Sequence, residues 1–152
     1  MSVGHYCKRE IVTVTRQDPI VTAAKLLREK HVGCLVVVEE KEGCIQPVGV
    51  VTDRDLVVEV LAAEINPQDI TIGDIMSYEV LTAWESDTIW ETLQRMRVKG
   101  VRRIPVVDEQ NALIGILSSD DLLEVLAEEL SQLAKLSNRE QQREAALRSS
   151  NT

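Results

Sequence analysis

The chain has 152 residues and a formal charge of −8, and apolar residues make up 44% of it although phenylalanine is absent. This length suits one domain or two small interlocked ones, and the acidic balance argues against general binding to DNA or RNA. No apolar run approaches the roughly 18 residues of a membrane-spanning helix. The first residues lack the basic and apolar regions of a signal peptide, and three irregularly spaced cysteines fit a reducing compartment, so we expect a cytoplasmic protein without membrane contact.

The first half of the chain predicts a strand, a helix, two strands and a second helix. Residues 11–15 are mostly β-branched, which favours a short strand. Asp18 and Pro19 then predict a helix start, with Asp18 as N-cap and Pro19 at the first helical position, and the helix ends near Gly33. The remaining expected elements are strands over residues 34–38 and 48–51, a loop over 41–47 between them, and a helix over about 53–63.

The second half repeats this plan. Asp18 aligns with Asp87, 69 residues later, and after the longer first-half loop Asp55 aligns with Asp121, 66 residues later. The corresponding elements are expected at residues 80–82, 88–99, 104–107 and 113–117, with a helix from 119. Each half is small for an independent core, so we predict an α+β fold of two intimately packed β-α-β-β-α repeats, residues 1–65 and 70–128, joined by a linker at 66–69.

The C-terminal stretch from Asp120 predicts one long helix. Four leucines recur at a 3-4-3 spacing, at positions 123, 126, 130 and 133. The next positions on that stripe, Ser137, Glu140 and Glu144, are polar, which argues against a sustained coiled coil. We therefore expect a polar helical tail over residues 129–152 that is partly disordered.

One motif occurs once in each half, as Gly-x-x-(Thr/Ser)-x-x-Asp. It runs from Gly49 through Thr52 to Asp55, and again from Gly115 through Ser118 to Asp121. Each copy places a hydroxyl residue and a carboxylate at a helix start after an apolar strand. A carboxylate there can accept two hydroxyl hydrogen bonds from a ribose. The same spacing also satisfies a capping box, which stabilises a helix start without any ligand.

These paired repeats and their closing motifs resemble a tandem pair of cystathionine-β-synthase (CBS) domains, a Bateman module, over residues 1 to about 128. The resemblance implies a pseudo-two-fold pair of repeats with two clefts that bind adenosine-containing ligands. It implies that Asp55 and Asp121 accept hydrogen bonds from the ribose, with Thr52 and Ser118 beside the sugar or phosphate. It also implies that each cleft joins the motif of one repeat to strand starts of the other. The first implied site comprises Val50, Thr52, Arg54, Asp55, Thr82, Val101, Arg102 and Arg103, and the second comprises Thr13, Val32, Gly33, Cys34, Ile116, Ser118 and Asp121.

The two implied sites differ in charge. Arg54 lies inside the first motif, and Arg102 and Arg103 stand at the strand start that the resemblance assigns to it. The equivalent of Arg54 in the second motif is Asp120. Because a phosphate needs positive partners, we predict that a phosphate-bearing ligand prefers the Asp55 site. The second site is then empty or takes a less charged adenosine derivative.

The sequence contains no set of catalytic residues: it has two histidines, no nucleophile motif, no metal-ligand cluster and no Walker-type glycine-rich loop. We therefore predict a stand-alone, non-enzymatic regulatory module with no catalytic cofactor and no metal. Its regulatory ligand is AMP, ADP or ATP, or alternatively S-adenosylmethionine or NAD, and its signal passes to an effector protein or to a change of oligomer. The alternative is a structural or interaction module with vestigial clefts.

Dimerisation is expected under both interpretations. The predicted helices carry apolar faces at Leu56, Val57, Val60 and Leu61, and at Leu122, Leu123 and Leu126, which exceed what two small repeats can cover. The family resemblance implies a disc of four repeats in a homodimer. Head-to-head and head-to-tail arrangements are both compatible with these residues.

Overall fold

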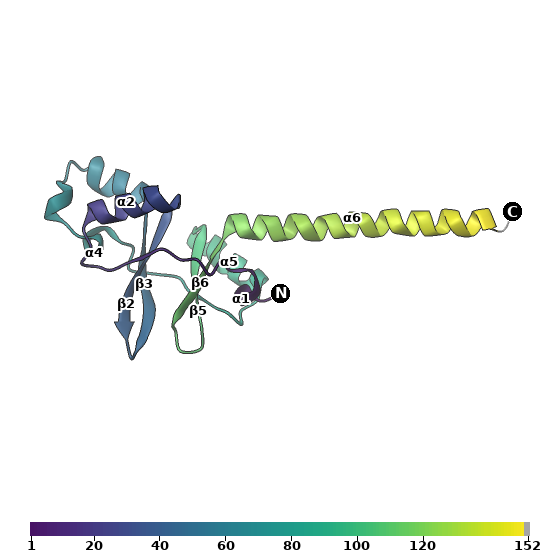
Figure 1. Cartoon of the computed structure of the whole chain (residues 1–152), viewed down its shortest axis with the longest axis horizontal. Coiled ribbons are helices and arrows are strands. Elements are labelled where there is room, and N and C mark those ends of the chain that lie inside the picture. The colour runs from purple at the N-terminus through teal and green to yellow at the C-terminus, as the bar shows by residue number, and fades with distance from the viewer. Residues whose placement is uncertain (151–152) are drawn as a thin grey trace. The chain divides into compact units, whose positions relative to one another are not determined.

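The computed structural model describes residues 1–150 and confirms the α+β class (Figure 1). Residues 1–118 form one compact unit that holds two three-stranded sheets. The second unit begins at Ser119 and contains the long helix α6 (Ser119–Ser150). The strands and helices follow one another in the β-α-β-β-α order expected for each half of the chain.

The first repeat forms a sheet with strand order β1-β2-β3. The strand β1 pairs in parallel with β2, in the register Thr13 to Val36, and β2 pairs antiparallel with β3. The elements are β1 (Thr13–Val14), α2 (Ile20–Lys30), β2 (Cys34–Lys41), β3 (Cys44–Thr52), α3 (Asp53–Asp55) and the π-helix η1 (Leu56–Leu61), followed by a short 3-10 helix, η2 (Pro67–Asp69), in the predicted linker.

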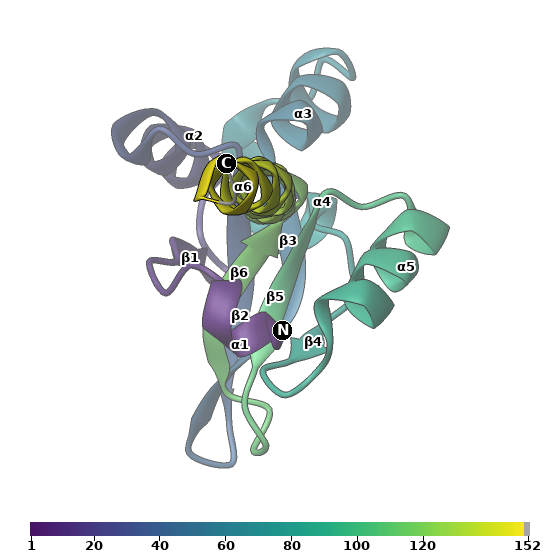
Figure 2. The ribbon, with the colours of Figure 1, turned by 90° about the vertical axis from the view of Figure 1, so that its right-hand side faces the viewer.

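The second repeat has the same topology, which confirms the duplication read from the sequence. Its sheet has the order β4-β5-β6, again with one parallel and one antiparallel pairing. Its elements are β4 (Ala83–Trp84), α5 (Ile89–Lys99), β5 (Arg103–Val107) and β6 (Leu113–Ser118). The β2-β3 and β5-β6 hairpins lie side by side in Figures 1 and 2, and β3 contacts β6 where the repeats meet.

The two repeats exchange their N-terminal helices. The helix α1 (Val3–Tyr6) precedes the first repeat in sequence but packs on the second. The backbone N–H groups of Val3 and Gly4 donate to the carbonyl oxygens of Asp87 and Glu85, both at 2.9 Å. The short segment after α1 then pairs with β6 in an isolated bridge from Lys8 to Ile116.

The equivalent helix of the second repeat, α4 (Ile72–Ile75), packs on the first repeat. The N–H groups of Ile72 and Gly73 donate to the carbonyl oxygens of Asp18 and Arg16, at 3.0 and 2.9 Å. Ile72 and Met76 are buried within the core of the first repeat. That core also contains Val14, Ile20, Ala23, Leu27, Leu35, Val37, Val51 and Val60. Neither repeat therefore has a complete core without the other.

Several local predictions were wrong at the level of single elements. The predicted loop over residues 41–47 is instead an extension of the β2-β3 hairpin, closed by Glu42 and Gly43, whose φ angles are 53° and 78°. Two consecutive residues with positive φ are typical of a type I′ hairpin turn. The second-half strand predicted over residues 80–82 lies slightly later in the chain, at β4.

The start of α2 also differs from the prediction. The N-cap is Pro19 rather than Asp18, and the first helical residue is Ile20. The Asp18 carboxylate accepts the N–H of Thr15 at 2.8 Å, so it closes the turn before the helix instead of capping the helix itself. Asp and Asn side chains favour both roles, which is why the sequence pattern alone did not separate them.

Candidate ligand-binding site

The strands that carry the two copies of the motif lie where the repeats meet. The strands β3 and β6, which end at Thr52 and Ser118, contact each other, and a helix begins directly after each of them. The segment that follows α4 crosses over Gly49, and the segment that follows α1 crosses over Gly115. A Cβ atom on Gly49 would stand 2.5 Å from the carbonyl oxygen of Ser77, and one on Gly115 would stand 2.6 Å from the Cys7 sulfur. The glycines therefore permit the close approach of these crossing segments.

Thr52 and Asp55 form a complete capping box at the start of α3. The Asp55 carboxylate accepts the Thr52 N–H at 2.8 Å, and the Thr52 hydroxyl accepts the Asp55 N–H at 3.2 Å. Both side chains are half-buried and held in one orientation. A carboxylate has about four acceptor positions, so the cap leaves Asp55 capacity for ligand hydroxyls. Capping and ligand binding are thus compatible roles for this residue.

Arg103 from the second repeat reaches the motif of the first. A Cβ atom on Gly33 would lie 3.4 Å from Asp53 Oδ2 and 3.7 Å from Arg103 Nη2, so both charged groups stand beside Gly33. The Asp53 N–H donates to the Gly33 carbonyl at 3.1 Å, which holds the start of α3 against the start of β2. A positive charge from one repeat and the acidic helix start of the other therefore meet at this point.

The pKa of the Cys34 thiol depends on charged groups of the same cluster. Burial raises the pKa of the Cys34 thiol from 9.0 to about 11, whereas the charge of Arg103 lowers it and those of Asp55 and Asp53 raise it. Gly33, which precedes Cys34, stands beside Asp53 and Arg103, and Cys34 pairs with Thr52, whose N–H donates to Asp55. Cys34, Arg103, Asp53 and Asp55 thus belong to one mixed-charge cluster between the repeats.

We expect the Cys34 thiol to resist alkylation in the folded protein. At pH 8, three units below the raised pKa, only about one Cys34 thiol in a thousand is ionised, and the side chain is buried. Iodoacetamide labelling followed by peptide mass spectrometry should modify the more accessible Cys44 first. The Arg103→Ala substitution should slow Cys34 labelling further, because it removes the positive charge that favours the thiolate. Faster Cys34 labelling in that variant would contradict the cluster.

The raised pKa of Cys34 also makes the stability of the fold depend on pH. Because the folded-state pKa of Cys34 is raised, the neutral thiol stabilises the fold below about pH 9. This contribution is lost as the pH rises from 9 to about 11, and a Cys34→Ala variant should lack that part of the pH dependence.

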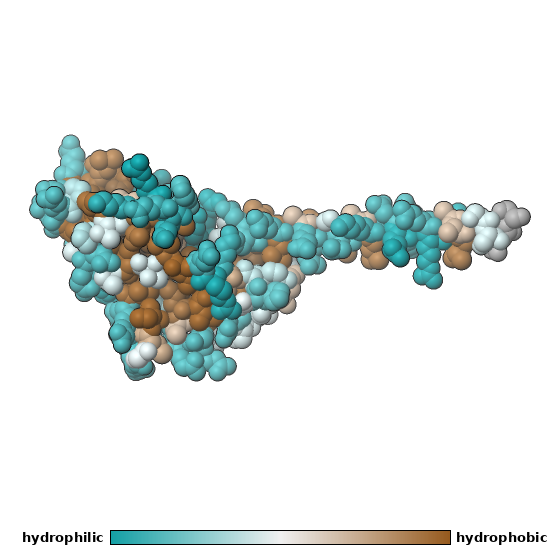
Figure 3. Space-filling view, viewed as in Figure 1, coloured by the Kyte–Doolittle hydropathy of each residue, from teal (hydrophilic) through white to brown (hydrophobic). Residues whose placement is uncertain are grey.

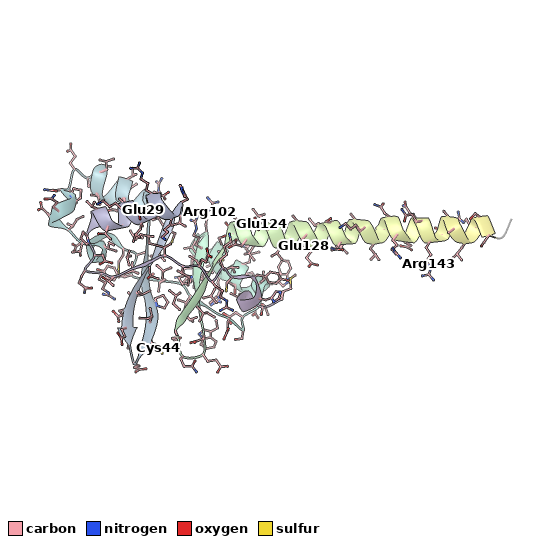
Figure 4. All side chains as sticks on the ribbon, viewed as in Figure 1. Glu29, Cys44, Arg102, Glu124, Glu128 and Arg143 are labelled. Carbon is pink, nitrogen blue, oxygen red and sulfur yellow. The ribbon has the colours of Figure 1, made fainter. Side chains whose placement is uncertain are left out.

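The other residues of the first implied site are spread more widely. The Val50 carbonyl accepts the N–H of Ser77 at 3.0 Å, and Arg54 is exposed. Thr82 lines a different pocket of about 470 Å³, together with Trp84, Asp87, Glu91 and Arg95. Val101 and Arg102 directly precede β5, and Arg102 is labelled in Figure 4. Arg103 of the second repeat stands beside Gly33, next to Asp53 of the first motif.

The second implied site draws on both structural units. Thr13 is exposed on β1, Val32 and Gly33 precede β2, and Cys34 begins it. Ile116 exchanges two backbone hydrogen bonds of 2.9 Å with Lys8. Ser118 ends β6, whereas Asp121 lies in the first turn of α6 and belongs to the second unit. The assembly of these residues into one site stays a prediction.

Sequence reasoning missed Asp53 inside the first motif, and Lys8 and Ser77 as neighbours of the two motif strands. The repeat alignment offered one signal, because Lys8 and Ser77 occupy equivalent positions in the two repeats. Lys8 forms a β-bridge with Ile116, and Ser77 forms one with Val50. Within residues 1–150 no group of three or more His, Cys, Asp or Glu side chains is arranged to hold a metal ion. No helix in that range has both the length and the apolar character needed to cross a membrane.

The chain is similar to known proteins over both repeats. The family model for the CBS domain matches residues 3–62 and 72–128. Protein MK0525 of Methanopyrus kandleri is 38% identical over 125 residues, which is 82% of this chain and 62% of that protein. The chain therefore spans less than two thirds of this relative.

Two solved structures are also similar. A putative signal-transduction protein with CBS domains from Burkholderia ambifaria MC40-6 is 30% identical with a TM-score of 0.73, covering 83% of this chain and 93% of the other. The CBS domain pair of protein MJ0100, in complex with 5′-methylthioadenosine and S-adenosyl-L-methionine, is 26% identical with a TM-score of 0.73. That match covers 85% of this chain and 98% of the other.

Proposed function

Because the chain belongs to the CBS-domain family, as a pair of its repeats, we propose that it is a non-catalytic regulatory module that binds an adenosine-containing ligand between them. The observation that carries the proposal is the cluster in which Arg103 of one repeat stands beside the capped helix start of the other. The ligands of the MJ0100 pair, both adenosine derivatives, support the ligand class.

Each group in the cluster has a distinct role toward such a ligand. Asp55 accepts the ribose hydroxyls, since its carboxylate is held in place by the Thr52 cap and retains acceptor positions. Arg103 contributes a charged, forked donor to a phosphate. Asp53 and Arg103 both stand beside Gly33, so an anionic ligand would compete with the Asp53 carboxylate for the Arg103 guanidinium.

The two sites are proposed to be unequal. The first motif has Arg54 inside it and Arg103 beside it, whereas the second has Asp120 next to Asp121. A phosphate-bearing nucleotide such as AMP, ADP or ATP therefore binds the Asp55 site, and the Asp121 site is empty or takes a less charged adenosine derivative. Ligand binding changes the module only if the ligand prefers one of its conformations, and the output then reaches an effector protein or the oligomeric state in the cytoplasm.

Thermal unfolding in the presence of AMP, ADP, ATP, S-adenosylmethionine or NAD tests ligand binding directly. A ligand at a hundred times its dissociation constant stabilises the folded state by about 2.7 kcal/mol, which raises the melting temperature by several degrees. Asp55→Ala should abolish the shift given by a phosphate-bearing nucleotide, and Asp121→Ala should preserve it. Equal losses from both substitutions would contradict the ranking of the sites.

Arg103 is expected to recognise phosphate rather than adenosine. Hydrogen bonds to charged groups contribute about 1.5–3 kcal/mol, so Arg103→Gln should weaken AMP binding by about 10- to 100-fold. Binding of 5′-methylthioadenosine, which has adenosine but no phosphate, should change by less than about threefold. Titration calorimetry with both ligands separates the contribution of the phosphate from that of the adenosine. Equal weakening of both ligands would show that Arg103 acts on the cleft as a whole.

The alternative function is that of a dimerisation or interaction module with vestigial clefts. A groove of about 760 Å³ between α2 and η1 favours it, since apolar side chains line it and Leu61 is 74% exposed. Apolar residues also gather on the surface of this unit in Figure 3. No thermal shift with any adenine ligand, together with loss of a homodimer in Leu61→Glu, would favour this alternative.

A further inference from the structure

The helix α6 has an apolar stripe along a surface that is exposed to water. Every described residue from 127 to 150 is exposed; Leu123, Leu130 and Leu133 are 62–66% exposed, whereas Leu126 is half-buried. Leu123, Leu126, Leu130 and Leu133 lie on one side of the helix, because a 3-4-3 spacing follows the period of an α-helix. A continuous stripe of this kind is typical of a helix that packs against another helix.

The charges of α6 are separated along its length. Residues 119–134 contain five acidic side chains and no basic one, namely Asp120, Asp121, Glu124, Glu128 and Glu129. Residues 135–150 contain four basic and two acidic side chains, namely Lys135, Arg139, Arg143 and Arg148 with Glu140 and Glu144. Figure 4 labels Glu124 and Glu128 in the first half and Arg143 in the second.

The helix macrodipole accounts for only part of this separation. Acidic residues stabilise the first turn of a helix and basic residues the last turn, and the effect falls off beyond those turns. Glu128, Glu129, Lys135 and Arg139 lie in the middle of the 32-residue helix, where this effect is absent. Their arrangement is complementary to a second helix of the same sequence that runs in the opposite direction.

We propose that two copies of this chain associate through α6 as a short antiparallel helix pair. Antiparallel pairing places the acidic half of each helix along the half that carries Lys135, Arg139 and Arg143 of the other copy. Parallel pairing would place like charges side by side, with the five acidic residues of each copy adjacent. The second copy of α6 is therefore the occupant that the charges fit, and the exposed leucines at the centre of the helix lie within its contact.

The charges also select the register. When Leu130 packs beside Leu133 of the other copy, the axis of the pair passes between Ser131 and Gln132, and Glu128 faces Lys135. A shift that pairs Leu126 with Leu130 would bring the Glu128 side chains of both copies together. In this register Leu126 lies opposite Ser137 and Leu123 lies opposite Glu140 of the other copy, so leucine packs on leucine only at Leu130 and Leu133. The pair spans residues 123–140, about 27 Å at 1.5 Å per residue.

Distances between spin labels on the full-length protein test this arrangement. In a Cys44→Ser background, whose other cysteines are buried, Ser131→Cys and Gln142→Cys are labelled in separate samples. Labels at 131 should be separated along the axis by about 2 Å and labels at 142 by about 30 Å. Equally short separations at both positions would show a parallel pair, and the absence of a short separation at 131 would show that α6 does not pair. Either result overturns the proposal.

A matched pair of substitutions tests whether the leucines of the apolar stripe are responsible for the short separation at 131. Leu130→Glu places a charge at the centre of the pair and should remove the short separation at 131. Leu147→Glu changes a leucine of similar exposure, 59%, that lies beyond the contact, and should preserve that separation. Both residues are exposed, so neither change removes core packing. Retained pairing in Leu130→Glu would also overturn the proposal, whether or not the repeats associate through another face.

Discussion

Replacing Ile72 with alanine is expected to lower the free energy of unfolding by about 2–5 kcal/mol, which is the usual cost of truncating a fully buried Ile to Ala. Ile72 is fully buried, and although it belongs to α4 it lies in the core of the first repeat, against residues of β1, α2, β2 and β3. Truncating this side chain of the second repeat therefore leaves a cavity in the core of the first repeat. Urea denaturation followed by circular dichroism measures the loss.

The control for this substitution is Ile45→Ala, since Ile45 is 49% exposed at the end of the β2-β3 hairpin. That change should cost well under half as much. The exchange of helices also predicts one cooperative transition for residues 1–118, because neither repeat keeps a full core alone. Two separate transitions in the Ile72→Ala variant would contradict this interdependence.

Replacing Gly49 with alanine is expected to cost about 1–3 kcal/mol, as is usual when an atom is forced into a packed site. The new Cβ would lie 2.5 Å from the carbonyl oxygen of Ser77 and 3.1 Å from the methyl group of Met76. Backbone atoms cannot move aside as a flexible side chain can, so the segment that follows α4 must shift. Thermal or urea unfolding of the purified variant measures the effect.

Gly33→Ala is the matched control for Gly49→Ala. Its Cβ would meet nothing closer than 3.4 Å, which is an ordinary contact, so the stability should change little. Gly115→Ala should behave like Gly49→Ala, because a Cβ there meets Cys7 and the carbonyl of Lys8 at 2.6 and 2.9 Å. If Gly33→Ala were as destabilising as the two motif variants, the close approach of the crossing segments would not be the cause.

These two predictions also bear on ligand binding. The segments that cross Gly49 and Gly115 form bridges with Val50 and Ile116, the central residues of the two motif strands. A shift of either segment would change the geometry of the cleft where Arg103 and Asp55 are proposed to bind a nucleotide. Stability and ligand affinity should therefore fall together in Gly49→Ala, whereas Arg103→Gln should affect affinity for phosphate alone.

The candidate site was predictable in part. The Thr52 and Asp55 motif and its capping geometry follow from residues three apart at a helix start, which is a local pattern. The family resemblance grouped Arg103 with this motif, and the structure places the Arg103 guanidinium beside Asp53 and Gly33. The residue Asp53 was overlooked because its part depends on Arg103, which lies 50 positions later in the chain.

Local sequence patterns were sufficient for the duplication, the order of elements, the α+β class and the long C-terminal helix, because periodicity and capping act between neighbouring residues. They were not sufficient for the helix exchange, in which α1 packs on β4 and α4 completes the core of the first repeat. Such contacts join segments that are distant in the chain, as when Ile72 donates to the Asp18 carbonyl, and the apolar residues of α1 and α4 would fit a core in either repeat. Only the packing of the whole unit selects the partner, through backbone hydrogen bonds such as that from Val3 to Asp87 and the close approaches that Gly49 and Gly115 permit.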